Sequence, residues 1–193
     1  MLKPKALKPG DTLGFVAPSS PVKTLDSVDK CVEAARSLGY NVVVGESCRS
    51  AHGYLAGDDR MRADDLNRMF ADDGIDGIIA IRGGYGAPRI LDMLDYELAA
   101  RHPKILAGYS DITALHIAYG QKSGLVTLHA PMPSTEWIQD DYDAFTEAGL
   151  WRALTSTEPL GPIPNPPECP VETLNGGVAR GRLVGGNLCL IAA

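Results

Sequence analysis

The 193-residue sequence has no apolar run of the roughly 18 residues that a membrane span needs, and its first residues lack the apolar core of a secretory signal. We therefore expect a cytoplasmic protein without a membrane partner. Basic residues are also few: 18 lysines and arginines face 24 acidic residues, and the formal net charge is −6. No basic stripe is available to neutralise phosphates, so a small soluble ligand is expected rather than nucleic acid.

Cysteine is scarce, with neither a C-x-x-C pair nor the spacing of a disulfide framework, and we interpret the four cysteines as reduced packing residues. The phosphate-binding patterns G-x-G-x-x-G and G-x-x-x-x-G-K-[ST] are both missing, so nucleotide binding is not predicted. An Asp/Arg cluster in residues 58–70 is interpreted as the solvated face of a surface helix rather than as a metal site. We accordingly predict no cofactor and no metal.

Apolar runs typical of buried strands alternate with stretches of helical spacing along the first 130 residues. Strands are predicted at residues 12–17, 41–44, 75–81, 104–107 and 125–128. Helices are predicted at residues 25–38, 58–70, 88–94 and 111–122. This alternation predicts an α/β domain built on an open, mainly parallel sheet with helices on both faces.

Ser110 falls in the turn between the strand at 104–107 and the helix that begins at Asp111. On such a strand-to-helix elbow a serine hydroxyl is exposed, and the next backbone N–H points the same way. The helix N-terminus also offers partial positive charge to an oxyanion, so Ser110 is a candidate nucleophile. The alternative is that Ser110 only caps the helix.

Two further loops follow strands at the same edge of the predicted sheet, where ligands bind in parallel α/β folds. The glycine-rich turn at 82–86 would let backbone N–H groups approach a phosphate or an oxyanion, or it is a plain tight turn. Ser19 and Ser20 after the first strand either touch a ligand or are polar turn residues. His129 lies at the end of the fifth predicted strand and joins the same crevice.

Past His129 the pattern changes. Residues 140–154 carry helical spacing, and residues 155–177 are rich in proline, which predicts an extended linker. Residues 178–184 alternate like a strand, and a Gly-Gly-Asn-Leu turn and an apolar helix start follow. We expect an N-terminal α/β domain at 1–154 with the nucleophile, a linker at 155–177, and the start of an incomplete C-terminal domain at 178–193.

The motifs, in this order, resemble the LD-carboxypeptidase family of serine peptidases, and the resemblance covers essentially the whole chain. It rests on the sequences LKPGD at 7–11, GYLAG at 53–57, IRGGYG at 81–86, GYSDIT at 108–113, HAPM at 129–132 and GGNL at 185–188. The resemblance implies release of the terminal D-alanine from cytoplasmic murein tetrapeptides by cleavage of an L,D peptide bond, during cell-wall recycling. The related microcin immunity peptidases imply a second candidate substrate, a toxic peptide-nucleotide conjugate. The resemblance also implies a possible homodimer.

The same resemblance implies roles for individual residues at the predicted crevice. Ser110 would be the nucleophile, the backbone N–H groups of Gly84 and Asp111 would form the oxyanion hole with Gly83 as a further candidate donor, and substrate would contact Arg82, Gly83, Tyr85 and His129. An arginine guanidinium can pair with a peptide carboxylate through two parallel hydrogen bonds.

The sequence departs from the family in one respect. The glutamate and histidine of the family's Ser-Glu-His triad follow the Gly-Gly-Asn-Leu turn, and only five residues follow Leu188 here. Among the histidines present, His129 is best placed but fits pocket lining better than base, whereas His116 should face away from Ser110. Because a serine needs a positioned base, we expect the 193 residues alone to have little or no carboxypeptidase activity. A catalytically incomplete peptide-binding module is the remaining alternative.

Overall fold

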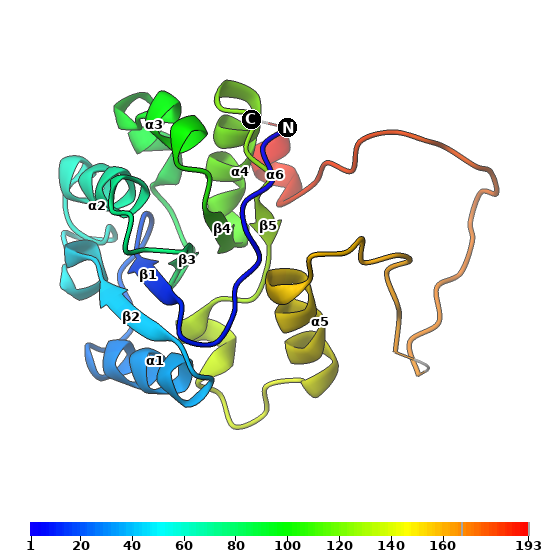
Figure 1. Cartoon of the computed structure of the whole chain (residues 1–193), viewed down its shortest axis with the longest axis horizontal. Helices are drawn as coiled ribbons and strands as arrows, with labels where there is room; N and C mark the ends of the chain where they lie inside the picture. The colour runs from blue at the N-terminus through cyan, green and yellow to red at the C-terminus, as the bar shows by residue number, and fades with distance from the viewer. Residues whose placement is uncertain (167, 193) are drawn as a thin grey trace.

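A five-stranded parallel sheet forms the centre of the computed structural model, which describes residues 1–166 and 168–192 (Figure 1). Its strands are β1 (Thr12–Val16), β2 (Asn41–Val44), β3 (Gly77–Ala80), β4 (Ile105–Gly108) and β5 (Leu128–His129). They lie in the order β2-β1-β3-β4-β5, and every pair is parallel. The α/β fold predicted from the alternating pattern is confirmed.

In the part of the chain that the structure describes, six α-helices connect and flank the strands. They are α1 (Asp26–Ser37), α2 (Asp59–Ala71), α3 (Tyr96–Arg101), α4 (Thr113–Lys122), α5 (Ala144–Thr155) and α6 (Leu188–Ile191). Local chemistry sets several of their ends: Asp58 accepts from the Met61 N–H at 2.8 Å to cap α2, and Gly39 takes a φ of +89° just after α1. The six-residue α3 was missed because it is too short to show a helical period.

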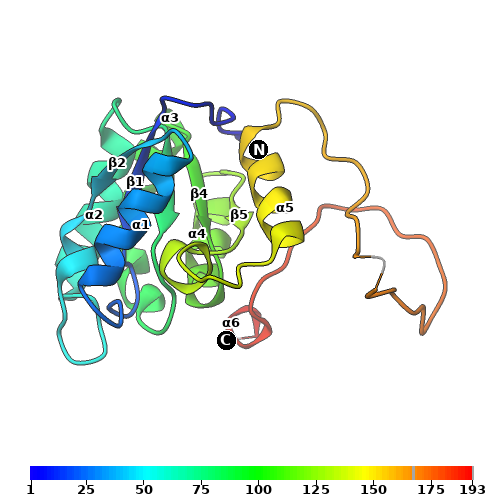
Figure 2. The ribbon, with the colours of Figure 1, turned by 90° about the horizontal axis from the view of Figure 1, so that it is seen from below.

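Alternate residues of each central strand enter two separate cores, one on each face of the sheet. Ile79 of β3 packs with α1 and α5, whereas its neighbour Ile78 packs with α2, α3 and α4. Figure 2 shows α1 and α5 along one side of the sheet. Because both faces are covered, the strands are continuous apolar runs rather than alternating ones, which is why they were visible in the sequence.

The fifth strand is shorter than predicted. Only Leu128 and His129 pair with β4, while Leu125 instead forms an isolated parallel bridge with Leu2 near the N-terminus. The strand still delivers His129 to the carboxyl edge of the sheet, beside Gly108.

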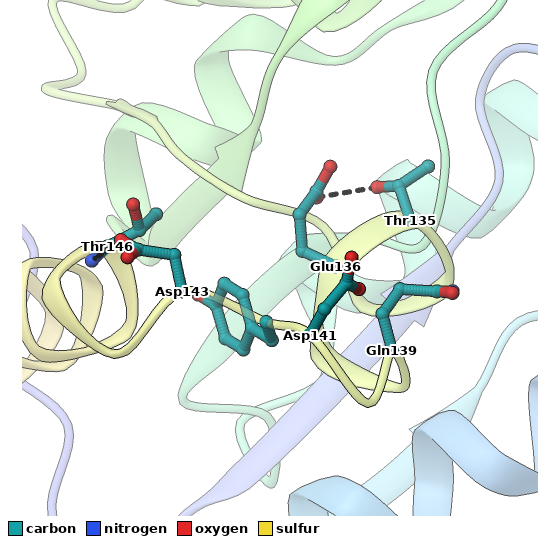
Figure 3. A pocket seen from close by; sticks show the side chains of 7 residues that line it. Thr135, Glu136, Gln139, Asp141, Asp143 and Thr146 are labelled. Atoms are coloured by element: carbon teal, nitrogen blue, oxygen red, sulfur yellow. Dashed lines mark hydrogen bonds between the residues drawn. The ribbon is translucent and has the colours of Figure 1, made fainter.

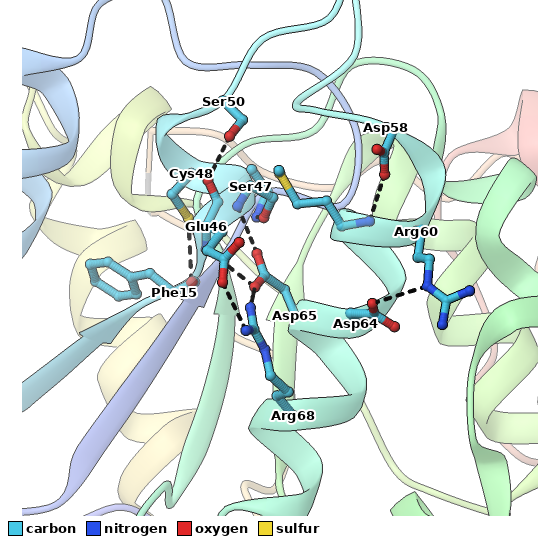
Figure 4. A network of polar contacts seen from close by, with 12 residues as sticks. Phe15, Glu46, Ser47, Cys48, Ser50, Asp58, Arg60, Asp64, Asp65 and Arg68 are labelled. Carbon is cyan, nitrogen blue, oxygen red and sulfur yellow. Dashed lines mark hydrogen bonds and ion pairs between the residues drawn. The ribbon is translucent and has the colours of Figure 1, made fainter.

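The charged face of α2 is not simply solvated, and this part of the sequence prediction was wrong. Arg62 and Asp65 are fully buried. Asp65 accepts from the backbone N–H groups of Glu46 (3.2 Å) and Ser47 (2.7 Å), and it also pairs with Arg68 (Figure 4). The carboxylate is buried because the turn that follows β2 leaves backbone N–H groups in need of an acceptor.

Replacement of Asp65 by alanine is therefore expected to lower the free energy of unfolding by about 3 kcal/mol, because two backbone N–H groups lose their acceptor inside the protein. Asp64 is the matched control: it lies next in the chain and faces Arg60 at 3.6 Å on the surface. Its replacement by alanine should cost less than about 0.5 kcal/mol. Urea denaturation of the two variants measures both values, and equal losses would contradict the assignment.

The predicted strand at residues 178–184 is wrong. These residues have no regular structure, and Val178 and Leu183 are almost completely exposed. A strand forms only where a neighbouring backbone offers hydrogen bonds, and no other segment of the described chain lies alongside this one. Residues 156–166 and 168–177 extend away from the sheet (Figure 1).

The chain returns to the sheet domain at the Gly-Gly-Asn-Leu turn. The Asn187 N–H donates to the Thr113 hydroxyl at 2.9 Å, and a Cβ on Gly186 would lie 2.5 Å from the Thr113 methyl group. The turn therefore lies against the first residue of α4, three positions after Ser110. Within residues 1–166 and 168–192, no helix is long and apolar enough to cross a bilayer, and no cluster of potential metal ligands occurs.

Candidate active site

Ser110 lies where the sequence predicted it, in the turn between β4 and α4. Its φ is +62°, and it is the one non-glycine residue with positive φ in the described part of the chain. A side chain in this left-handed region costs about 1 kcal/mol, and such residues persist where the surrounding structure forces them. The turn is thus a strained strand-to-helix elbow rather than an ordinary helix start.

The alternative that Ser110 caps a helix is not supported. Neither the short helical turn Ser110–Ile112 nor α4 begins with a side-chain cap, and Ser110 itself is half-buried. The neighbouring carboxylate of Asp111 does not cap the helical turn Ser110–Ile112 or α4 either. It is buried and accepts from the Ser19 hydroxyl (2.6 Å) and the Ala87 N–H (2.7 Å).

The glycine-rich turn at 82–86 packs directly on the elbow. A Cβ on Gly83 would lie 3.1 Å from the Cβ of Ser110 and 3.5 Å from the Asp111 nitrogen. Gly84 has a φ of +114°, and a Cβ there would lie 2.5 Å from the Cβ of Ser20. The approach requires glycine at position 84 and leaves little room for a side chain at position 83, so the turn is more than a generic tight turn.

Two backbone N–H groups next to Ser110 are left without protein acceptors. Within the residues that the structure describes, neither the Gly84 nor the Asp111 N–H donates a hydrogen bond. By contrast, the Tyr85 N–H donates to the Ser20 hydroxyl at 3.1 Å. Free backbone donors beside a serine hydroxyl are the groups that an oxyanion hole requires.

The remaining predicted substrate contacts surround the same turn. The Arg82 guanidinium is half-buried and donates through Nη1 to the Pro21 carbonyl at 2.5 Å. Among residues 1–166 and 168–192, its other N–H groups have no hydrogen-bond acceptor. The Tyr85 side chain is 75% exposed. His129 is exposed beside Tyr109, with ring centroids 6.0 Å apart.

His116 does not turn toward solvent but supports the strand that leads into the elbow. Its Nε2 lies 2.9 Å from the Gly108 carbonyl, and its ring is 6.2 Å from that of His129. Burial lowers the pKa of His116 to about 4, with a smaller contribution from the nearby His129, while the Gly108 carbonyl acts in the opposite direction. A histidine that stays neutral in this way suits a structural role.

The depressed pKa of His116 predicts a pH-dependent loss of stability. Its pKa is about 4 in the folded protein against the ordinary 6.5, so its contribution is complete above about pH 6.5 and is lost as the pH falls toward 4. Between pH 7 and pH 5 the wild type should lose about 1 to 2 kcal/mol more unfolding free energy than His116→Gln, whose amide can still donate to Gly108. Urea melts of both proteins at the two pH values measure this, and parallel curves would contradict it.

A pocket lies next to Tyr109, the residue that precedes Ser110 (Figure 3). Tyr109 donates its hydroxyl to Glu136 Oε1 at 2.7 Å, and Glu136 Oε2 accepts from the Met132 N–H at 2.8 Å. The pocket is lined by Thr135, Glu136, Gln139, Asp141, Tyr142, Asp143 and Thr146. Three carboxylates and no basic side chain line it, so it does not suit an anionic group.

Sequence reasoning missed several residues that build the site. The sequence leaves Ser19 and Ser20 open between ligand contact and polar turn, gives no role to Glu136, and places Arg62 on the solvated face of α2. A signal for Arg62 was present, because it lies four residues before Leu66 and therefore on the apolar face of the helix. No comparable signal marks the Tyr109–Glu136 contact, since its partners are 27 residues apart.

A parallel α/β sheet that presents a serine on a strained elbow, beside free backbone donors, is the architecture of a serine-hydrolase class. The chain belongs to the LD-carboxypeptidase family: residues 13–130 match the LD-carboxypeptidase N-terminal domain. It is 43% identical to the probable murein peptide carboxypeptidase of Bacillus subtilis over 198 residues, which cover 99% of this chain and 59% of that protein.

Solved structures agree with this assignment. The microcin C7 self-immunity protein in its apo state superimposes with a TM-score of 0.78 at 28% identity, over 82% of this chain and 48% of that one. The muramoyltetrapeptide carboxypeptidase of Oxalobacter formigenes gives a TM-score of 0.69 at 27% identity, over 75% of this chain and 48% of that one. The chain spans about three fifths of the length of the curated relatives that it matches.

Proposed function

We propose that this chain carries the nucleophile of a serine LD-carboxypeptidase that releases the terminal D-alanine from cytoplasmic murein tetrapeptides. One observation carries the proposal: Ser110 is held at a φ of +62° next to the unpaired N–H groups of Gly84 and Asp111. The packing of the fold does not require a strained serine with free donors beside it. We therefore assign these features to function.

In the proposed reaction the Ser110 hydroxyl attacks the carbonyl carbon of the L,D peptide bond. The carbonyl oxygen becomes an oxyanion, and we assign the N–H groups of Gly84 and Asp111 as its donors because neither has a protein acceptor within the described residues. The proton of Ser110 needs a base, and the resemblance to the family assigns this to a histidine oriented by a glutamate, both beyond the Gly-Gly-Asn-Leu turn.

Substrate recognition is assigned to the turn and to the neighbouring strand end. The free N–H groups of Arg82 suit the carboxylate of the departing D-alanine, and the exposed side chains of Tyr85 and His129 offer contacts to the peptide. The acidic pocket beside Glu136 does not suit this carboxylate, which favours the Arg82 side of the elbow.

The choice of murein peptide as substrate is supported by the 43% identical relative named as a murein peptide carboxypeptidase. A peptide-nucleotide conjugate is the second candidate, because the microcin C7 self-immunity protein of Escherichia coli is 33% identical over 124 residues. Structures of that protein are described with aspartyl sulfamoyl adenosine and glutamyl sulfamoyl guanosine. Higher identity over nearly the whole chain favours the murein peptide.

The test uses the full product of the gene that encodes this chain. It is incubated separately with murein tetrapeptide and with aspartyl sulfamoyl adenosine, and release of D-alanine and of aspartate is followed. D-alanine release that Ser110→Ala abolishes supports the proposal. Faster cleavage of the conjugate would replace the substrate, and turnover of neither compound despite measurable peptide binding would favour the binding module.

A further inference from the structure

Two buried charges lie on opposite sides of the loops that form the site. Arg62 on α2 is fully buried, and Asp111 at the elbow is 4% exposed. Buried charges are costly unless hydrogen bonds and opposite charges compensate them, so such a pair is retained only where its contacts matter. The two side chains do not touch each other; they contact the same two loops.

The contacts repeat the same pattern on each loop. Arg62 Nη1 donates to the Pro18 carbonyl (2.5 Å) and to the Gly86 carbonyl (2.9 Å). The next residue along each loop donates to a single oxygen of Asp111, from the Ser19 hydroxyl (2.6 Å) and from the Ala87 N–H (2.7 Å). The loop after β1 and the loop after β3 are therefore both held between a guanidinium and a carboxylate.

The Gly86–Ala87 peptide group is fixed at both ends, since its carbonyl binds Arg62 and its N–H binds Asp111. A peptide held between opposite charges cannot rotate without breaking a charge-assisted hydrogen bond. The β1 loop passes this restraint to the glycine turn: the Ser20 N–H donates to the Gly83 carbonyl at 3.2 Å. Gly84, whose N–H is free, lies between these two fixed points.

We propose that Arg62 and Asp111 form an ionic clamp that positions the glycine turn, and with it the Gly84 N–H, over Ser110. The inference rests on the proposed function, because it assigns the clamp to the oxyanion hole of that reaction. Arg62 and the carboxylate of Asp111 are positioning residues and do not touch substrate. An oxyanion hole tolerates errors of only about half an ångström, which explains why both loops are fixed so firmly.

The charges also compensate each other near a site that must hold a negative oxyanion. Arg62 pairs with Asp59, and Asp59 pairs with Arg89 at 2.8 Å. Together with Asp111 these side chains carry two positive and two negative charges. The carboxylate of Asp111 can thus lie beside the elbow without adding net negative charge there.

The test compares variants of Asp111 in the full gene product with two readouts. Asp111→Asn keeps a carbonyl oxygen for both donors but removes the charge, whereas Asp111→Ala removes both contacts. We expect the Ala87 amide hydrogen to exchange faster in Asp111→Asn than in wild type, and faster still in Asp111→Ala, where the rate should rise at least about tenfold. We expect kcat for D-alanine release to fall in the same order, with KM within about threefold of wild type, because the clamp acts on the transition state.

Asp95→Asn is the matched control, since Asp95 caps α3 on the surface by accepting from the Leu98 N–H at 2.7 Å, and neither readout should change. If Asp111→Ala does not fold, Asp111→Asn and Ser19→Ala carry the test. Unchanged exchange at Ala87 would overturn the clamp, and faster exchange with unchanged kcat would overturn its positioning role. A wild type without peptidase activity would overturn the proposed function, while amide exchange would still decide whether the clamp exists.

Discussion

Replacement of Ser110 by alanine or by glycine is expected to lower D-alanine release by the full gene product at least ~10³-fold, because both variants lack the attacking oxygen. The two variants should differ in stability. Alanine retains the side-chain clash at a φ of +62°, whereas glycine does not, so Ser110→Gly should be about 1 kcal/mol more stable than Ser110→Ala. Initial rates and urea melts of the three proteins measure both effects.

The stability comparison separates strain from chemistry. A serine that caps the helix predicts a different comparison with wild type, because loss of the cap destabilises both variants, by about 1 kcal/mol for alanine and by roughly a few tenths for glycine. Relief of strain predicts instead that Ser110→Gly is at least as stable as wild type. Equal stability of the two variants would mean that the elbow relaxes in solution. Retained activity in Ser110→Ala would require another nucleophile and would remove the basis of the proposed function.

Substitution of Gly84 by alanine should be the most disruptive single methyl addition in the loops around the site. Its Cβ would lie 2.5 Å from the Cβ of Ser20, at a φ of +114° that side chains rarely adopt. We expect a loss of about 3 kcal/mol in unfolding free energy and about 10²-fold in kcat, because the turn must move and take its N–H away from the oxyanion.

Gly149 provides the matched control, because it lies within α5 and a Cβ there would meet nothing within 4 Å. Gly149→Ala should stabilise the protein by about 0.5 to 1 kcal/mol, as alanine favours helix, and leave activity unchanged. A second substitution, Ser20→Gly, removes the atoms that collide and should restore part of the stability of Gly84→Ala. Without such recovery, the collision would not be the cause of the loss.

Much of this site could be predicted from the sequence because its parts follow strands. The strand end before Ser110 and the turn at 82–86 were found from apolar runs and glycines, and a parallel sheet brings such ends to one edge. The hydrogen bonds that hold these loops in place could not be predicted in the same way. The sequence predicts Asp111 as a helix-start residue, whereas in the structure its carboxylate accepts from Ser19, which is 92 residues away in the chain.

The sequence predictions were wrong where one residue pattern is compatible with two different structures. Alternation at 178–184 is typical of a strand, but that segment has no partner within the described residues and stays exposed. The charges of α2 are typical of a solvated face, yet Arg62 and Asp65 are buried. Arg62 donates to a loop carbonyl, and Asp65 accepts from loop N–H groups. Local sequence cannot show which polar groups a distant loop leaves unpaired.

The sequence by itself determined the α/β class, the elbow at Ser110 and the family, because these depend on periodicity and on short motifs that act locally. Only the tertiary structure decided that Ser110 is strained, that the N–H groups of Gly84 and Asp111 are free, and that Arg62 and Asp111 hold two loops between them. Those features depend on contacts between segments up to 92 residues apart. Contacts of that range form only when the sheet brings the carboxyl ends of its strands together.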